Sequence, residues 1–184
     1  MLPDAKPRKK IHIRKVSCQG YKRDDGLWDI EGHLKDTKTY NFKTDYRGDM
    51  SAGMAVHDMS IRLTLDDNLT IKNVEIDMTS HPYGTCPGII KNFQKLIGVS
   101  ISKGFRKNVY SKVGGINGCT HLVELLFPIA TTAFQTIYSY KSFSKKKDTV
   151  NIETEPSLIN SCHSWKEDGE VIKRYYPKFY KVKS

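Results

Sequence analysis

The most regular apolar pattern in the chain is a helical one. Over residues 122–137, apolar side chains recur at intervals of three and four, the spacing of one continuous stripe on a helix. They are Leu122, Leu125, Leu126, Ile129, Ala130, Ala133, Phe134 and Ile137. The pattern therefore predicts one long helix with a single apolar face.

Alternation of apolar and polar residues predicts a sheet before this helix. Residues 27–34 and 59–65 alternate with a period of two, which is typical of half-buried strands. A further strand is expected over residues 11–18. Arg23-Asp24-Asp25-Gly26 supplies a tight turn, because Asp-Gly tolerates the positive φ that hairpins require.

The last predicted strand, residues 69–78, changes phase part-way. Its apolar positions are odd at Leu69 and Ile71 but even from Val74 onward, which predicts a β-bulge near residues 72–73. Two shorter helices are expected after it. The first begins at Cys86-Pro87 and ends at Gly98, because proline suits a first helical position and glycine a terminus.

The order of strands followed by helices predicts an α+β fold. We expect an antiparallel β-sheet meander of about four to five strands, covered on one face by two to three helices. A single domain is expected over residues 11–176. It lies between a flexible basic arm, residues 1–10, and a basic aromatic tail, residues 177–184.

Charge modifies this picture at the two ends of the chain. The net charge is +10, and residues 1–15 contain six basic side chains against Asp4, whereas residues 173–183 contain five and no acid. Between these ends the charges balance, so the excess is expected on solvated tails. Binding of nucleic acid or another anion through the tails is an alternative function that we favour less.

The four cysteines indicate the compartment. Cys18, Cys86, Cys119 and Cys162 are widely separated, which suits reduced thiols in the cytoplasm better than a disulfide framework. The chain shows neither a signal-peptide pattern nor an apolar run of membrane-spanning length. A soluble cytoplasmic protein without a membrane span is therefore expected, and a homo-oligomer is left open.

Cysteine and histidine side chains that could bind a metal lie at two predicted helix starts. Cys119 and His121 follow a glycine-rich turn at the start of the long helix, and Cys86 lies at the start of an earlier one. His57 has the parity of the buried strand face, so it points toward the helical layer. Thiolate and imidazole ligands suit zinc or iron. We therefore predict a mixed Cys/His metal site of His57, Cys86, Cys119 and His121, with His81 as a substitute ligand.

Other interpretations of these residues remain open. Glu124 lies one helical turn from His121 and could orient it or relay a proton. In a metal-free thiol enzyme, Cys119 is the nucleophile of acyl or sulfur transfer and His121 or His57 is its base. The cysteines could equally be packed core residues. The sequence thus does not decide whether the protein is an enzyme.

A third group of polar residues lies on the second predicted strand. Asp29, Glu31 and His33 project from the face opposite to its apolar side chains. Three such groups could gather a cation or move protons, but a face of this kind more often meets water. We favour the solvated face.

Several segments together resemble a bacterial family described only as domain of unknown function 2889. They are residues 20–32, residues 52–59 with Ala52-Gly53 and His57-Asp58-Met59, residues 118–122 with Gly118-Cys119-Thr120-His121-Leu122, and Cys162-His163. The likeness covers roughly residues 11–176. It implies no activity.

A weaker resemblance is to iron–sulfur cluster scaffold proteins and their zinc-binding relatives. Strands, a turn, a helix ending in glycine and a cysteine before a further helix follow in a similar order. The resemblance implies a sheet covered by helices, with a metal site at the loop tips. It places Cys119 at the last cysteine ligand and His57 at the aspartate beside the ligands. The chain departs from that pattern at Ala55, which occupies the first cysteine position, and near His81, where the second is expected.

Overall fold

The fold is described by a computed structural model that places residues 1–145 and 158–182. The chain divides into two compact units, Met1–Tyr140 and Lys141–Ser184. The first unit contains the sheet and the helices that cover it. The second contains three short helical segments, η3 (His163–Trp165), α3 (Glu170–Tyr175) and η4 (Pro177–Phe179).

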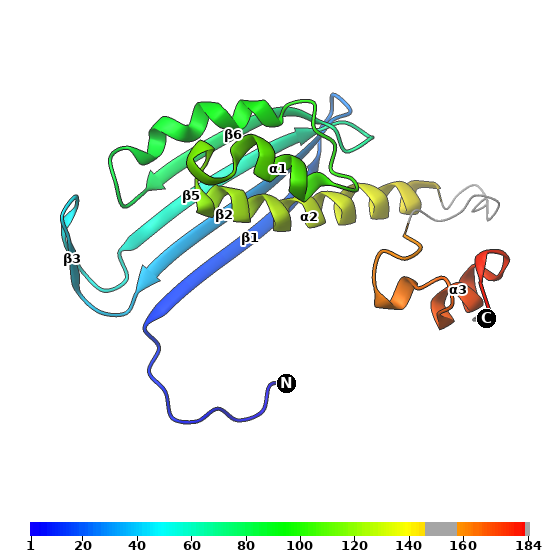
Figure 1. Ribbon diagram of the computed structural model, residues 1–184, viewed down its shortest axis with the longest axis horizontal. Helices are drawn as coiled ribbons and strands as arrows, with labels where there is room; N and C mark the ends of the chain where they lie inside the picture. Colours follow the sequence, from blue (N-terminus) through cyan, green and yellow to red (C-terminus); the bar gives the residue numbers. More distant parts are fainter. Residues whose placement is uncertain (146–157, 183–184) are drawn as a thin grey trace. The chain divides into compact units, whose positions relative to one another are not determined.

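A four-stranded antiparallel sheet forms one layer of the first unit (Figure 1). Its strand order is β1-β2-β5-β6. The strands are β1 (His12–Lys22), β2 (Trp28–Lys38), β5 (Ala55–Leu65) and β6 (Ile71–Ser80). Between β2 and β5, the short strands β3 (Phe42–Thr44) and β4 (Gly48–Met50) form a separate two-stranded sheet.

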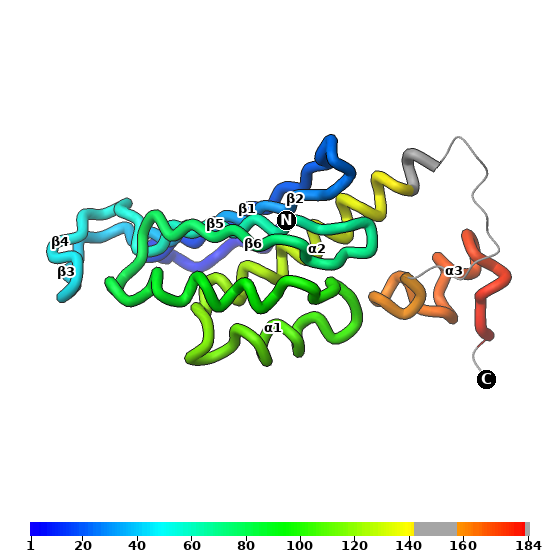
Figure 2. Tube along the Cα trace, turned by 90° about the horizontal axis from the view of Figure 1, so that it is seen from above, coloured from blue at the N-terminus to red at the C-terminus, as the bar shows by residue number. Residues whose placement is uncertain are grey.

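The helical segments of the first unit lie on one side of this sheet, as Figure 2 shows. They are the 3-10 helix η1 (Cys86–Leu96), α1 (Phe105–Val113), the single turn η2 (Gly115–Asn117) and the long helix α2 (Thr120–Lys145) as far as Tyr140, where the first unit ends. The predicted α+β fold, an antiparallel sheet covered on one face, is therefore confirmed. No helix among residues 1–145 and 158–182 is long and apolar enough to cross a membrane.

The covered face of the sheet holds the core. Even positions of β2 and, from Met59 onward, odd positions of β5 point toward the helices, and their apolar side chains are at most 2% exposed. They are Trp28, Ile30, Leu34, Met59, Ile61, Leu63 and Leu65. The stripe of α2 joins the same cluster through Leu122, Leu125, Leu126 and Ile129. Because burying each large side chain contributes roughly 1.5–3 kcal/mol, this interface fixes the position of α2 on the sheet.

Helix α2 approaches the sheet closely over a glycine. A Cβ at Gly32 would lie 2.5 Å from Cδ1 of Ile129, closer than side-chain atoms pack. Gly32 belongs to the covered stripe of β2, so the absence of a side chain there lets Ile129 reach the strand.

Three register shifts interrupt the sheet. Thr64 pairs with Asn73, but Leu65 pairs with Ile71, so Lys72 is the extra residue of a bulge in β6. The bulge predicted near residues 72–73 is thus confirmed. A second shift in the β5–β6 pair lies between Asp58 and Met59. The third lies between β2 and β5, directly after Asp36.

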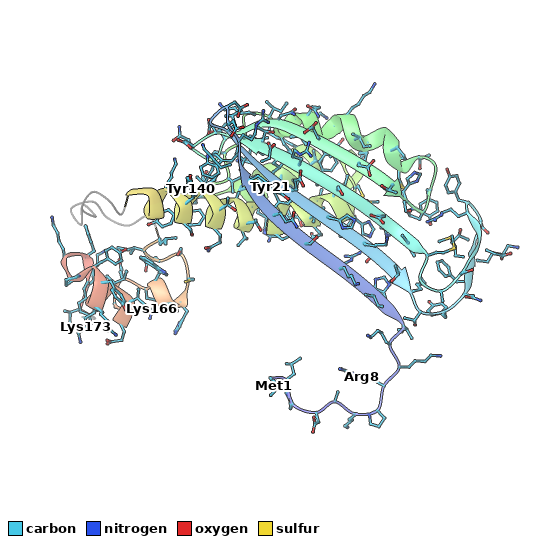
Figure 3. The ribbon with its side chains drawn as sticks, turned by 180° about the vertical axis from the view of Figure 1, so that it is seen from behind. Met1, Arg8, Tyr21, Tyr140, Lys166 and Lys173 are labelled. Atoms are coloured by element: carbon cyan, nitrogen blue, oxygen red, sulfur yellow. The ribbon has the colours of Figure 1, made fainter. Side chains whose placement is uncertain are left out.

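The other face of the sheet is open within the first unit (Figure 3). Its side chains are mainly polar, and they form ion pairs across the strands. The predicted alternation of faces along β2 and β5 therefore corresponds to one helix-covered face and one polar face.

Candidate functional site

Asp36 ends the covered stripe of β2. It follows Trp28, Ile30, Gly32 and Leu34 at the same parity, so the strand carries its carboxylate to the helix-facing side. Only 1% of Asp36 is exposed. A buried carboxylate requires partners, because an unpaired buried charge is strongly unfavourable.

Strand β1 supplies two of these partners. Arg14 pairs with Asp36 in the sheet register. It donates from Nε to Oδ1 at 2.8 Å and from Nη2 to Oδ2 at 2.6 Å. His12 Nε2 lies 3.2 Å from Oδ1. Burial alone opposes ionisation of Asp36, but the Arg14 hydrogen bonds and charge, with His12 and His57, outweigh it and lower the pKa to about 2.

His57 approaches the same carboxylate from β5. It lies directly opposite Asp36 in the register, at the last regular pair before the strands shift. Its Nδ1 is 3.1 Å from Asp36 Oδ2, and 12% of its side chain is exposed. The prediction that His57 faces the helical layer is therefore confirmed.

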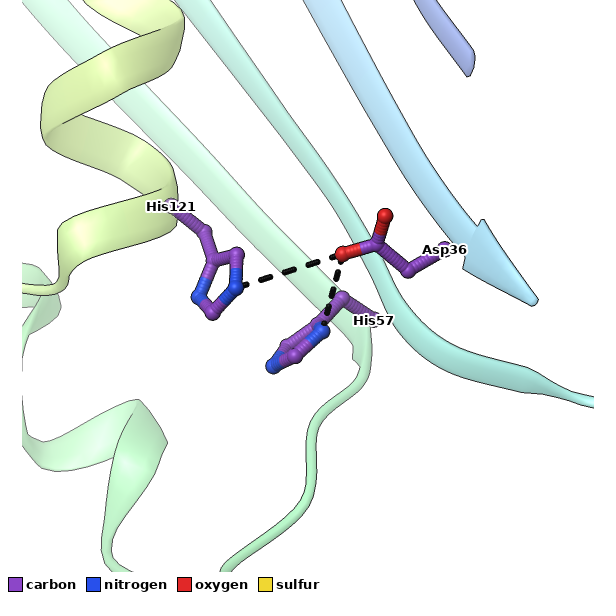
Figure 4. A group of neighbouring side chains, drawn as sticks. All are labelled: Asp36, His57 and His121. Atoms are coloured by element: carbon purple, nitrogen blue, oxygen red, sulfur yellow. Dashed lines mark hydrogen bonds and ion pairs between the residues drawn. The ribbon is translucent and has the colours of Figure 1, made fainter. Parts of the chain in front are cut away.

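His121 reaches the group from the first turn of α2, as Figure 4 shows. Its Nε2 lies 3.9 Å from Asp36 Oδ2. The two imidazole rings are 3.7 Å apart between centroids, with 31° between their planes. Three strands and one helix thus bring their polar side chains to one half-buried point.

Burial favours the neutral form of both histidines. Burial lowers the pKa of His57, and the neighbouring His121 lowers it further. Burial likewise lowers the pKa of His121, with a contribution from the Arg14 charge. Neutral imidazoles beside an ionised carboxylate offer lone pairs to a Lewis acid at neutral pH.

Asp36, His57 and His121 have the spacing of a metal site. One ligand atom from each lies within 4.8 Å of the others. Ligand atoms about 2.1 Å from a tetrahedral zinc ion lie about 3.4 Å apart. The separations of Asp36 Oδ2 from His57 Nδ1, 3.1 Å, and from His121 Nε2, 3.9 Å, lie on either side of this value. Within residues 1–145 and 158–182, this is the one group of three or more such residues that could hold an ion.

The mixed Cys/His site expected from the sequence is not what the structure assembles. His57 and His121 come together, but Asp36 completes their group instead of a cysteine. Cys119 Sγ lies 3.9 Å from His121 Nδ1, the ring nitrogen that faces away from Asp36. Cys86 is half-buried and packs against the apolar core. The group that could hold an ion in the described part of the chain therefore contains no cysteine.

The two further candidates have other partners. His81 Nδ1 donates to the carbonyl of Tyr83 at 2.8 Å, and its ring stacks on Tyr46. Glu124 is exposed and accepts a hydrogen bond from the Tyr110 hydroxyl at 2.9 Å. Neither belongs to the group around Asp36.

The polar side chains of β2 on the open face form separate ion pairs. His33 Nε2 lies 2.6 Å from Asp58 Oδ1, and Glu31 pairs with Arg62 at 2.8 Å. Asp29 accepts a hydrogen bond from Thr64 at 2.7 Å. Glu31, His33 and Arg62 line an open groove of about 440 Å³. The contacts of this face are those of a polar sheet surface.

Three members of the cluster were missed from the sequence: His12, Arg14 and Asp36. The alternation that predicts the second strand covers residues 27–34 and stops before Asp36. Extending its alternation by one step places Asp36 on the covered face, and the same parity in β1 aligns Arg14 beside it.

A family comparison matches residues 12–135 to the model described as "Protein of unknown function (DUF2889)". The chain belongs to the DUF2889 family. The matched DUF2889 segment begins at His12 and includes Arg14, Asp36, His57 and His121, so the whole cluster lies within it.

The family description assigns no activity, and no curated protein and no solved structure matches the chain. The weaker resemblance to iron–sulfur scaffold proteins therefore has no support. A function for this DUF2889 member is therefore inferred from the geometry of Asp36, His57 and His121.

Proposed function

We propose that this DUF2889 domain binds one transition-metal ion, zinc or ferrous iron, through Asp36, His57 and His121. The observation that carries the proposal is the convergence of one ionised carboxylate and two neutral imidazoles at one end of the covered sheet face. Imidazole favours zinc and iron over calcium and magnesium, which prefer oxygen ligands.

Three protein ligands leave room for a further ligand on the ion. Structural zinc sites are closed by four protein ligands, whereas catalytic zinc and non-haem iron sites keep an open position. His121 is 26% exposed on its side chain, so solvent can reach the group. The extensive apolar core also supplies stability without a metal. The proposed ion is therefore assigned to reactivity more than to folding.

Arg14 has two opposing effects in this proposal. Its two hydrogen bonds orient the Asp36 carboxylate and keep it anionic, as partners of metal ligands commonly do. Its positive charge also repels a cation bound beside Asp36. We expect this repulsion to moderate the metal affinity.

The test is a metal analysis of the full chain. Protein purified without oxygen and without chelator is analysed by plasma mass spectrometry, before and after incubation with zinc or ferrous iron. The proposal predicts about one ion per chain in the wild type. Asp36→Asn, His57→Ala and His121→Ala are expected to lose stoichiometric metal.

Two sets of controls make this result specific. Cys86→Ser and Cys119→Ser are expected to keep the metal. His33→Ala, which removes a histidine paired with an aspartate on the open face, is also expected to keep it. Circular dichroism checks that every variant is folded. Absence of metal uptake by the wild type contradicts the proposal. Loss of metal in Cys119→Ser would show that Cys119 is a ligand and would contradict the proposed ligand set.

One observation favours a second candidate function, a metal-free thiol enzyme. Cys119 Sγ faces Nδ1 of His121, and Nε2 of the same ring faces Asp36, each at 3.9 Å. This is the order nucleophile, base, orienting carboxylate. In acyl transfer, His121 would take the thiol proton as the sulfur bonds to the acyl carbon. His121 would then protonate the leaving group as its bond to that carbon breaks, and an acceptor such as water would later cleave the thioester and free the sulfur.

Thiol reactivity distinguishes this second candidate. Metal-free protein is treated with a small excess of iodoacetamide at neutral pH, and the modified residues are located by mass spectrometry. If the protein is a thiol enzyme, iodoacetamide is expected to alkylate Cys119 faster than the exposed Cys162. His121→Ala is expected to remove that preference. Faster labelling of Cys162 in the wild type contradicts the thiol mechanism.

A further inference from the structure

The helical layer of the first unit carries an uneven charge. From residue 78 to residue 123 the sequence contains no aspartate and no glutamate, but it contains six lysines and arginines. They are Lys91, Lys95, Lys103, Arg106, Lys107 and Lys112. We call these six residues the basic helical surface. It is distinct from the basic ends of the chain.

The fold turns all six side chains outward. In η1, Phe93 and Leu96 are buried, and in α1 the buried residues are Phe105, Val109 and Val113. These apolar sides point into the core, whereas the six basic residues are exposed. The two helices pack against each other on the same side of the sheet (Figure 2). Their positive charges therefore share one layer.

These charges lack acidic partners in the described part of the chain, where no ion pair involves any of the six. The sheet behaves differently, since Arg14, Arg62 and Lys35 each pair with a carboxylate. Arg106 instead lies 3.7 Å from the centre of the Phe127 ring, which holds its guanidinium in place. A set of like charges without partners adds repulsion to the folded state, so its charge is available to a polyanion.

We propose that the basic helical surface binds the phosphate backbone of nucleic acid, without selection of sequence. Lys91 and Lys95 lie on η1, Arg106, Lys107 and Lys112 lie on α1, and Lys103 lies in the turn just before α1. Charges spread along two packed helices suit a polymer of phosphates better than a single anion. Insertion into a lipid surface requires an outward apolar helix face, whereas Phe93 and Leu96 of η1 and Phe105, Val109 and Val113 of α1 are buried. This inference is independent of the proposed metal site.

The experiment compares two full-length variants that lose the same charge at different places. In the first, Lys103→Gln, Arg106→Gln and Lys107→Gln neutralise the helical surface. In the second, Lys6→Gln, Arg8→Gln and Lys9→Gln neutralise the N-terminal arm. Fluorescence anisotropy measures binding to a labelled 20-nucleotide single-stranded RNA and a 20-base-pair DNA duplex at several salt concentrations.

The wild type is expected to bind at least one of the two probes at low salt, with an affinity that falls as salt rises. The helical variant is expected to bind about tenfold more weakly or worse, and its salt slope is expected to be lower by about 2 to 3 because three phosphate contacts are removed. The arm variant is expected to stay within about twofold of the wild type.

Three outcomes overturn the inference. They are absence of wild-type binding at low salt, an equal or larger loss in the arm variant, and an unchanged salt slope in the helical variant. Sedimentation with phosphatidylglycerol vesicles is measured in parallel. Vesicle binding without binding to either nucleic acid assigns the surface to lipid and also contradicts the proposal.

Discussion

Two aspartate–histidine pairs lie on opposite faces of the same sheet. His57 and Asp58 are neighbours in β5, so their side chains point to opposite sides. His57 meets Asp36 on the covered face, with 3.1 Å between Nδ1 and Oδ2. Asp58 meets His33 on the open face, with 2.6 Å between Oδ1 and Nε2. The two pairs have the same chemistry in different surroundings.

The surroundings decide what each pair can do. The Asp36 side chain is 1% exposed and that of Asp58 is 17% exposed, whereas the two histidines are 12% and 44% exposed. On the covered face, α2 adds His121 as a third donor; on the open face, Lys35 adds a cation beside Asp58. A helix start over one end of a sheet therefore turns an ion pair into a candidate metal site.

The largest expected difference between the two faces is in metal affinity. His57→Ala and His121→Ala each remove a proposed ligand, so the zinc affinity is expected to fall by more than the roughly 10- to 100-fold that losing an outer partner costs. His33→Ala on the open face is expected to leave it unchanged. Competition with a zinc-binding dye measures all three. An equal effect of His33→Ala would remove the distinction between the faces.

The next difference concerns packing under α2. Gly32→Ala directs a methyl group at Ile129, which is expected to lower the free energy of unfolding by about 1–3 kcal/mol. Glu31→Ala, one residue away on the open face, is expected to change it by about 1 kcal/mol at most, because its ion pair with Arg62 is exposed. Urea denaturation compares them, and similar values for both variants would contradict the assigned faces.

A smaller difference is expected between the two carboxylates. Asp36→Asn weakens charge-assisted hydrogen bonds around a buried group, so in metal-free protein the free energy of unfolding is expected to fall by about 2 kcal/mol. Asp58→Asn weakens partly exposed contacts and is expected to cost about 1 kcal/mol or less. Urea denaturation in the presence of chelator measures both variants. A larger loss of unfolding free energy in Asp58→Asn than in Asp36→Asn would contradict the prediction.

The stabilisation by the Asp36 carboxylate is expected to depend on pH. The folded pKa of Asp36, about 2, lies below its ordinary value of 3.8, so its ionised form stabilises the fold above that value. This contribution is lost as the pH falls from 3.8 toward 2. The difference in unfolding free energy between wild type and Asp36→Asn, measured in chelator, is therefore expected to shrink over that interval. A constant difference would mean that Asp36 is not held ionised by its partners.

Much of the fold follows from local patterns. The alternation of residues 59–65 places Met59 and Leu63 on the covered face, and the phase change before Val74 locates a real bulge. Such features depend on parity along one strand, and burial of one face enforces that parity. The inward direction of His57 follows from the same argument.

The partners of His57 depend on contacts between distant segments. Asp36 lies 21 residues before His57 and Arg14 lies 22 before Asp36, so only the strand register brings them together. The position of His121 depends on how α2 is placed on the sheet, which the close approach at Gly32 determines. The positions of Cys86 and Cys119 at helix starts favour them as metal ligands, because a helix start stabilises a thiolate. That local argument does not determine how far each thiol lies from His57 and His121.

Cobalt titration tests the central claim most directly, because the spectrum of the metal reports its ligands. Metal-free wild-type protein is titrated with Co²⁺ without oxygen, and the near-ultraviolet and visible absorption is recorded. We predict saturation near one equivalent, with the weak visible bands of nitrogen and oxygen ligands, and loss of these bands in His57→Ala. Absence of saturable binding contradicts the site, and an intense thiolate-to-cobalt charge-transfer band that disappears in Cys119→Ser contradicts the Asp36, His57 and His121 ligand set.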